Sequence, residues 1–474
     1  MDDPVPTIVV VGSGGAGLAA ALAAAEAAHA NAVVCRIALI EKAPPGAHGG
    51  NTRWSPSYMR MAAPDRVEAG FVDDLDAISG GRMDRTYVHR LAAEAPATIA
   101  WLAAHGIAFD RPVYYLSAGP PRIQPVGGGA TVLRELGRAA ASAGVDIRYE
   151  CTANRLLLDR DGATQAVELR TADGRRETIA ADAVVLASGG FAGNSEMLAR
   201  HLGPGAESLR PIAPGTSFNT GEGIAMALAA GACAGGDWAG MHAEPVDPRS
   251  TASAPVVLVY PYGILIDRTG RRFFDEGAGL VHETWERLAR TIHFAAPGRI
   301  VYAILDARLY DIAGYQRAIR SEVAPFQAGS VAELAALIDV PPAALQATVA
   351  RYNASATGDA ARFDATRADG LAAAADLSPS KSNWARPLDR PPYLAYPLIG
   401  AIAYTFGGIA TNADAQVLSK SGEPIPGLYA AGEMTGHFFG TAPNAVAMLR
   451  ALVFGRIAGT RAVTYCLARR SRGY

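Results

Sequence analysis

The sequence is poor in cysteine and has no clustered metal-binding residues. Its four cysteines, Cys35, Cys151, Cys233 and Cys466, are far apart in a chain of 474 residues and show neither a CxxC nor a metal-ligand spacing. Neither a disulfide framework nor a metal site is therefore expected. This cysteine usage fits a reducing compartment, so we expect the protein in the cytoplasm.

Charge and long apolar runs are also scarce. Only 19% of the residues are charged, and the formal net charge is −2. Without a basic cluster, nucleic acid is a poor partner, because phosphate binding needs concentrated Lys and Arg. The most apolar stretch begins at Leu18 and is interrupted by Glu26 and His29, so it falls short of the roughly 20 apolar residues of a membrane span. We expect no membrane insertion and a small molecule as the partner.

The chain opens with a pattern typical of dinucleotide binding. In "TIVVVGSGGAGLAAALAAAEAA" an apolar, β-branched segment leads through Gly12, Gly14 and Gly17 into an Ala-rich helix. Gly12 permits the turn, Gly14 lets the backbone approach a pyrophosphate, and Gly17 lets the helix pack close to the strand. The helix N-terminus would then face the phosphates.

The next apolar strand ends in Glu41, 24 residues after Gly17. A dinucleotide site places an acid near this distance to bind the adenosine ribose. Taken alone, Glu41 could equally end a strand in solvent, but the glycines favour binding.

Later segments favour FAD over NAD. "HGGNTRWS" follows Glu41, and both "ADAVVLASGGFAGN" and "GLYAAGE" read as buried strands that end in small residues. An extended flavin dinucleotide needs contacts this widely separated, whereas NAD is usually held by one contiguous fold.

Several longer motifs are specific to one family. They include "VVLASGGFAGN", "YPYGILIDRTGRRFFDEGA", "FGGIATNADAQVL", "PIPGLYAAGE" and "VFGRIAG". Over essentially its whole length the sequence resembles the flavoprotein family of soluble fumarate reductases, 3-ketosteroid dehydrogenases and tricarballylate dehydrogenase, the last most closely. The resemblance implies an α/β fold, in which a Rossmann-like FAD-binding domain carries an inserted α+β capping domain.

The resemblance also implies domain limits and a mode of FAD attachment. Residues 1–236 and 404–474 would form the FAD-binding domain, and residues 237–403 the cap. His48 is offset from the flavin-linking histidine of succinate dehydrogenases, so we expect non-covalent FAD.

The expected cofactor residues lie in the glycine loop, at the ends of the apolar strands and near the C-terminus. By resemblance, Glu222 would lie beside the flavin and Glu433 would bind its ribitol. The full set is Gly12, Ser13, Gly14, Gly15, Ala16, Gly17, Glu41, Lys42, Gly49, Gly50, Asn51, Thr52, Ser55, Ala153, Ala187, Ser188, Gly189, Gly190, Glu222, Gly432, Glu433, Ala447 and Met448.

The implied reaction is dehydrogenation of a small metabolite next to a carbonyl or carboxylate, by hydride transfer to flavin N5. One alternative is an ene-reductase that runs the reverse reaction. Another is an electron-relay flavoprotein without substrate turnover of its own. An electron-acceptor protein or a quinone would complete the redox cycle.

Three residues are candidates for proton transfer. His242 falls where fumarate reductases place a substrate-binding histidine, and Tyr404 where relatives place a second histidine or a tyrosine-type acid. Either could equally be an ordinary loop or strand residue. His282 is a weak replacement for an arginine that the family carries nearby. Arg60, Tyr262 and Asn444 are the expected substrate-binding residues.

Two departures from the family put the substrate in doubt. The arginine expected after "FFDEGAG" is replaced by Leu280, or by Val281 in the tricarballylate pattern. Residues 442–445, Ala-Pro-Asn-Ala, stand where relatives have Arg-Leu-Gly-Gly or Tyr-Pro-Gly-Gly. Because bidentate arginine is the usual way to bind a carboxylate, we expect a smaller or less anion-binding pocket than in the relatives.

Overall fold

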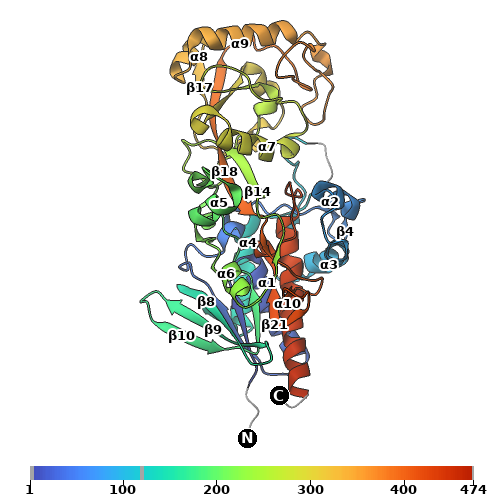
Figure 1. The fold of residues 1–474 in the computed structure, drawn as a ribbon. Helices are drawn as coiled ribbons and strands as arrows, with labels where there is room; N and C mark the ends of the chain where they lie inside the picture. Colours follow the sequence, from blue (N-terminus) through green and yellow to red (C-terminus); the bar gives the residue numbers. More distant parts are fainter. Residues whose placement is uncertain (1–4, 118–121, 472–474) are drawn as a thin grey trace.

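A mostly parallel sheet forms the centre of the lower part of the molecule (Figure 1). The computed structural model describes residues 5–117 and 122–471, and in these the strand order is β20-β21-β11-β1-β2-β7. All neighbours are parallel except β20 and β21. The strands are β1 (Thr7–Val11), β2 (Arg36–Ile40), β7 (Asp146–Arg148), β11 (Ala183–Leu186), β20 (Gln416–Leu418) and β21 (Pro424–Ala430).

Four of these strands end in a single row. Val11 is in register with both Ile40 and Leu186, and Leu186 is in register with Ala430. The loops that follow therefore leave the sheet at one edge. In an open α/β sheet, ligands bind at this carboxyl edge.

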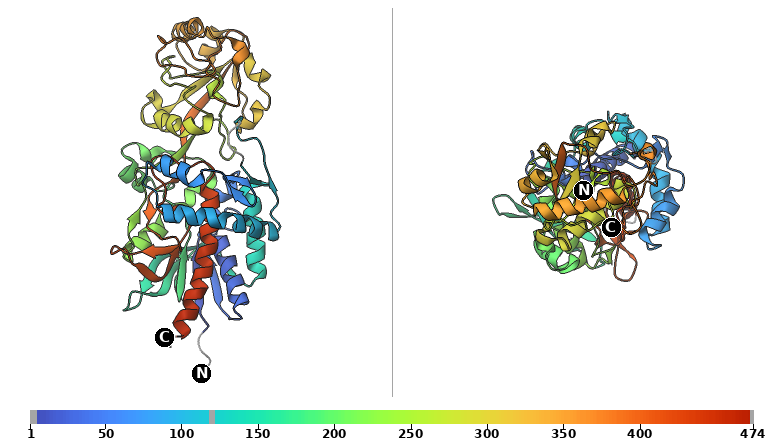
Figure 2. Two further views of the ribbon diagram at one scale, coloured as in Figure 1. Left: turned by 90° about the vertical axis from the view of Figure 1, so that its right-hand side faces the viewer. Right: turned by 90° about the horizontal axis from the view of Figure 1, so that it is seen from above.

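Both faces of the sheet are covered, which explains why its strands are continuous apolar runs. Ile8 and Val10 pack on one side with helices α1 (Gly15–Ala30) and α10 (Ala447–Ser471). Val9 and Val11 pack on the other side with a sheet of β8 (Cys151–Leu158), β9 (Thr164–Thr171) and β10 (Arg176–Ala180). Figure 2 shows α10 running along the lower part, crossed by α3 (Arg85–Ala104).

Helices α1 and α10 approach each other unusually closely. A Cβ atom at Gly459 would lie 2.0 Å from the carbonyl oxygen of Ala20, and one at Gly455 would lie 2.4 Å from that of Ala16. Only glycine fits at these two positions, because a side chain would clash with backbone atoms of α1, which cannot move aside as a flexible side chain could. The close contact fixes α1, and with it the glycine loop that precedes it.

The cap is built on a second sheet, of order β12-β18-β16-β15, with β14 and β17 also paired to β18. Its central strand β18 (Tyr393–Thr405) descends from the cap toward the lower part (Figure 1). The expected boundary between residues 403 and 404 thus falls inside one continuous strand, and the domain limits stay a prediction. The other strands are β12 (Arg210–Pro211), β14 (Met241–Val246), β15 (Ile264–Ile266), β16 (Val301–Leu305) and β17 (Phe326–Ala328).

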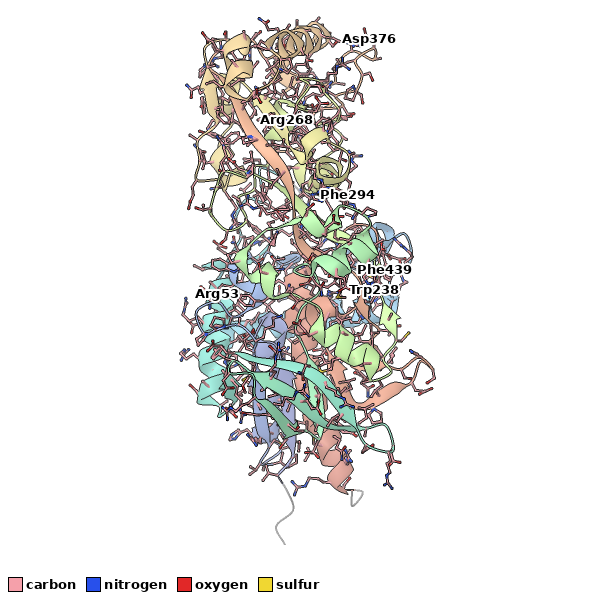
Figure 3. All side chains as sticks on the ribbon, turned by 60° about the vertical axis from the view of Figure 1, so that its left-hand side comes forward. Arg53, Trp238, Arg268, Phe294, Asp376 and Phe439 are labelled. Carbon is pink, nitrogen blue, oxygen red and sulfur yellow. The ribbon has the colours of Figure 1, made fainter. Side chains whose placement is uncertain are left out.

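Helices complete the cap and the edges of the lower part. In Figure 3, Arg268 marks the cap, while Arg53 and Trp238 mark the middle of the molecule. The cap helices are α7 (Val281–Phe294), α8 (Val331–Leu337) and α9 (Pro342–Ser355). The remaining helices and short strands are β3 (Met61–Ala63), β4 (Arg66–Val67), α2 (Phe71–Ser79), β5 (Phe109–Asp110), β6 (Gln124–Pro125), α4 (Gly128–Ser142), α5 (Ser195–Leu202), α6 (Glu222–Ala229), β13 (Ala234–Gly235) and β19 (Gly408–Ile409).

The helix contact generates a first prediction. Gly459→Ala should lower the free energy of unfolding by about 1–3 kcal/mol, because the new methyl group forces α10 away from α1. Gly137→Ala in α4 is the matched control, since a Cβ atom at Gly137 would have no neighbour within 4 Å. There, helix propensity alone should raise stability by up to about 1 kcal/mol. Urea unfolding followed by circular dichroism measures both, and a Gly459→Ala variant as stable as the control would contradict the close packing.

Candidate active site

A cavity of about 300 Å³ lies along the carboxyl edge of the central sheet. It is lined by all the expected cofactor residues except Gly17 and Gly190. Gly17 and Gly190 instead allow neighbouring groups to come close, because neither residue has a side chain. A Cβ at Gly17 would lie 1.8 Å from the carbonyl oxygen of Gly12, and one at Gly190 would lie 2.3 Å from a carboxylate oxygen of Glu433.

Glu41 stands at one end of the cavity and is buried. One of its oxygens accepts hydrogen bonds from the backbone N–H and the hydroxyl of Ser13, at 2.9 and 2.6 Å. The other accepts from the backbone N–H of Ala43 at 2.8 Å. His48 lies beside it, with Nδ1 3.1 Å from the Ser13 hydroxyl. His48 thus belongs to the Glu41 end, and non-covalent attachment of FAD stays a prediction.

Lys42 and Glu222 form an ion pair on the cavity wall, with 2.8 Å between Nζ and Oε1. Burial alone would raise the pKa of Glu222, but hydrogen bonds from Lys42 and Thr220 outweigh it and lower that pKa below its usual value. The pair joins the end of β2 to the start of α6. The expected place of Glu222 beside the flavin stays a prediction.

Glu433 stands at the other end of the sheet edge, just after β21. Its carboxylate accepts hydrogen bonds from the backbone N–H of Thr405 at 3.2 Å and from the side-chain amide of Asn219 at 3.0 Å. Burial raises the pKa of Glu433 to about 7, although the backbone N–H groups of Thr405 and Gly190 and the nearby Arg450 oppose the shift. Glu433 is therefore poised to exchange a hydrogen bond with a polar ligand.

The geometry of the glycine loop fits an extended dinucleotide. A Cβ at Gly14 would meet only the Gly49 carbonyl oxygen and the Thr52 hydroxyl, both at 3.7 Å. The protein itself therefore tolerates a side chain there, and the open space faces the cavity. With an acid at each end of the cavity, the residues present suit FAD.

His242 and Tyr404 are partners across two antiparallel strands. They face each other in the register of β14 and β18, where the pairing then skips Ala403. Their ring centroids are 4.8 Å apart with an angle of 33° between the planes. Both side chains line the cavity, so the structure brings together the two residues expected to handle the proton.

His242 is clamped between two carboxylates. Its Nδ1 lies 2.8 Å from Glu286 on α7, and its Nε2 lies 3.1 Å from Glu244 on its own strand. Burial opposes the charged form, but the hydrogen bonds to Glu244 and Glu286 outweigh it and raise the pKa of His242 to about 9. The imidazolium and its two carboxylates together carry one negative charge at neutral pH.

The structure does not bring Arg60, Tyr262 or His282 to the cavity. Arg60 is buried and paired with Glu68 and Asp74. The Tyr262 hydroxyl donates to the carbonyl oxygen of Ala365 inside the cap.

His282 packs 5.5 Å from the ring of Tyr114. Burial, helped by nearby arginines, lowers the pKa of His282 to about 4, so its ring is neutral. None of the three residues lines the cavity, so their expected roles in substrate binding and proton transfer stay predictions.

The loop of residues 442–445 lines the cavity as expected from its place in the sequence. Ala445 has a φ of 57°, in the left-handed region where glycine is preferred. The backbone thus keeps a glycine-like conformation while a methyl group is added to the wall. The buried Oδ1 of Asn444 has no hydrogen-bond partner among the described residues.

Several cavity residues were missed by sequence reasoning. Glu244 could have been found, because it follows His242 by two positions in a strand, where side chains return to the same face. Arg450 lines the cavity and donates to the carbonyl oxygens of Gly432 and Thr435. Trp285 and Arg320 come from distant cap segments, and no local pattern marks either as a cavity residue.

Comparison with known proteins agrees with FAD as the cofactor. A family model described as "FAD binding domain" matches residues 7–447. The chain is 28% identical over 478 residues to "Fumarate reductase (cytochrome)" of Shewanella frigidimarina, covering 97% of this chain and 77% of that protein. It is 29% identical over 482 residues to "Urocanate reductase" of Eggerthella lenta, covering 96% and 74% of the two chains.

Solved structures show the same fold. The open conformation of a flavocytochrome c3 fumarate reductase superposes with a TM-score of 0.79 at 26% identity, over 98% of this chain and 79% of that chain. The fold and the cavity define a flavoprotein. The chain belongs to the FAD-binding family whose model it matches.

These matches confirm several expectations. The α/β fold with a cap, FAD as the cofactor and an oxidoreductase acting on CH–CH bonds are confirmed. The specific likeness to tricarballylate dehydrogenase is not tested and stays a prediction. Within residues 5–117 and 122–471, no helix has the length and apolarity to cross a membrane, and no three His, Cys, Asp or Glu side chains gather as a metal site.

The open position at Gly14 gives the second prediction. Gly14→Val should abolish FAD binding while the protein still folds, because the side chain fits the protein but occupies the pyrophosphate's place. The readouts are flavin released on denaturation per mole of protein and the circular dichroism spectrum. Gly137→Val is the control, because it lies outside the cavity with free space around it. Stoichiometric flavin in Gly14→Val would refute the placement of the pyrophosphate.

The clamp on His242 gives a prediction for pH. Because the pKa of His242 is raised from 6.5 to about 9, its protonated form stabilises the fold fully below pH 6.5, and this contribution is lost as the pH rises through 9. Relative to His242→Gln, wild type should lose about 3 kcal/mol of unfolding free energy between these values.

Urea unfolding at several pH values measures this difference. His293→Gln is the control, because burial lowers the pKa of His293 below 6.5, so the ring loses little charge as the pH rises from 6.5 to 9. A difference between wild type and His242→Gln that does not change with pH would contradict the clamp.

Proposed function

We propose that this chain moves a hydride and a proton across a C–C bond next to a carbonyl or carboxylate of a small molecule, with Tyr404 as the proton-carrying residue. The observation that carries the proposal is the cross-strand pair of His242 and Tyr404 in the cavity lined by the expected FAD residues. Within the described residues the Tyr404 hydroxyl makes no hydrogen bond. It is therefore available to a substrate.

Bound FAD supplies the group that accepts or donates the hydride. The chain's own contribution at the adjacent carbon is an acid. Burial raises the pKa of Tyr404 well above its usual value of 10, and the negative charge of Glu286 adds to the shift. The phenol therefore keeps its proton until a developing carbanion next to the carbonyl draws it away.

His242 positions the Tyr404 ring and does not itself transfer a proton to the substrate. Both of its ring nitrogens are bound to carboxylates, so no free N–H points at a substrate. Its ring packs beside that of Tyr404 and limits the movement of the phenol. The carboxylates Glu244 and Glu286 meanwhile keep the phenol protonated.

The neutral phenol is the form of Tyr404 that donates a proton in the reductive direction. Dehydrogenation uses the same groups in reverse and begins with the phenolate as the base. Two relatives are named for reductions, of fumarate and of urocanate, which supports the reductive direction. The proposed electron partner is a separate protein or a quinone, and the proposed location is the cytoplasm.

Anaerobic half-reactions of the FAD-loaded protein test the function. Reduced flavin should be reoxidised by α,β-unsaturated acids or ketones, and oxidised flavin should be bleached by their saturated counterparts if the enzyme runs in reverse. Absorbance of the flavin reports both. No response to either panel would overturn the proposal and leave an electron-relay role.

Tyr404→Phe tests the assigned acid. The variant should bind FAD with an unchanged visible spectrum, while turnover falls roughly 10²-fold, because only the phenolic proton is removed. Tyr396→Phe is the matched control, since Tyr396 lies in the same strand but does not line the cavity. Equal turnover in the two variants would return Tyr404 to a packing role.

A further inference from the structure

Four cationic side chains line the cavity within the described part of the chain, and three of them have partners. Lys42 is paired with Glu222, His242 is clamped by two carboxylates, and Arg450 donates to two backbone carbonyls. Arg320 differs, because its side chain makes no hydrogen bond or ion pair with any described residue. Its guanidinium is the cation left available to a ligand.

The backbone holds Arg320 firmly at the cap side of the cavity. Its N–H donates to the carbonyl oxygen of Val256 at 2.8 Å, and Ile319 bridges to Val257. On the other side, the Ser321 hydroxyl donates to Asp247 at 2.8 Å. The half-buried guanidinium therefore extends from a fixed base, which suits a binding group better than a free surface chain.

An aromatic wall, formed by Tyr58, Tyr114, Tyr115 and Trp285, lines the same cavity. The Tyr58 and Tyr115 rings lie 5.6 Å apart, and the Tyr115 and Trp285 rings 5.5 Å apart. Trp285 in turn lies 5.9 Å from His242. The rings thus form a continuous row that reaches the His242–Tyr404 pair, and such a surface favours a flat, apolar ligand.

The charge of the cavity argues against a second anionic group on the substrate. The cluster of His242, Glu244 and Glu286 carries one net negative charge, and Glu244 lines the cavity. A second carboxylate would face this cluster, at a cost that burial increases. Besides Arg320, Arg450 is the cavity cation without a carboxylate partner in the described residues, and its guanidinium already donates to two backbone carbonyls.

We propose that Arg320 binds the single carboxylate of a planar aromatic substrate, whose ring packs on the aromatic wall while its C=C bond lies toward Tyr404. This inference rests on the proposed function and names the substrate class of the same site: aryl-substituted unsaturated monocarboxylates. Arg320 replaces, from a different cap segment, the arginines that relatives carry near residues 280 and 442. Dicarboxylates such as fumarate are excluded as good substrates.

The test compares three compounds on the FAD-loaded enzyme with a reduced viologen as electron donor: 3-phenylpropenoate, its uncharged amide, and fumarate. Wild type should have the highest kcat/KM for 3-phenylpropenoate. Arg320→Gln should raise the KM for that acid about 10- to 100-fold, because a charge-assisted hydrogen bond is lost. The KM for the amide should stay unchanged. Arg317→Gln is the control, since Arg317 lies nearby but does not line the cavity.

The outcomes separate this inference from the proposed function. Turnover of 3-phenylpropenoate with equal KM in wild type and Arg320→Gln would overturn the role of Arg320. A higher kcat/KM for fumarate than for 3-phenylpropenoate would overturn the monocarboxylate substrate class. Either result leaves the proposed function standing. If none of the three compounds turns over, the proposed substrate class fails, and the half-reactions with the wider panel of acids and ketones decide the proposed function. Binding of 3-phenylpropanoate, read from the flavin absorbance, then decides the role of Arg320: weaker binding to Arg320→Gln than to Arg317→Gln supports it, and equal binding overturns it.

Discussion

The alignment of four strand ends in one row is the constraint on which the site depends. Val11, Ile40, Leu186 and Ala430 close their strands at the same level. Residues that are hundreds of positions apart in sequence, from Gly12 to Glu433, therefore meet along one edge. Helix α10 contacts α1 closely, which is possible only because Gly455 and Gly459 lack side chains. This contact fixes α1 and the glycine loop that precedes it at the edge of the sheet. The binding site follows from strand register rather than from any single motif.

The second constraint is the long strand β18, which connects the cap with the lower part. Its register with β14 sets Tyr404 beside His242, and the next residue, Thr405, donates its backbone N–H to Glu433. One strand thus positions both the proposed acid and an expected flavin ligand. A shift of one residue in this register would turn Tyr404 away from the cavity, because neighbouring side chains in a strand point to opposite faces.

Local sequence patterns were enough to predict that a glycine loop and an acid would meet at the end of the first two strands of the sheet. Glycine spacing, a strand before it and an acid after it depend on short-range geometry, so Gly12, Gly14, Gly17 and Glu41 could be assigned from the sequence alone. The residues at the cap end of the cavity could not be predicted in this way. Arg60 and Tyr262 carry suitable side chains, but their partners, Glu68 and Ala365, take them out of the cavity. No local pattern reveals such long-range partners.

The same reason explains why Arg320 and the aromatic wall escaped prediction. Tyr58, Tyr115, Trp285 and Arg320 come from four separate segments, and only the folded cap places them together. The loss of the family's arginines was visible in the sequence. From that loss we expected a pocket less suited to anions. This expectation was incomplete, because a different segment of the chain can supply an arginine to the cavity.

The most direct test of the account is a crystal structure of the FAD-loaded protein. FAD should lie along the carboxyl edge, with its ribose at Glu41, its ribitol at Glu433 and its flavin ring next to the His242–Tyr404 pair. A flavin ring bound at the Glu41 end, or one turned away from Tyr404 with other side chains between them, would contradict it.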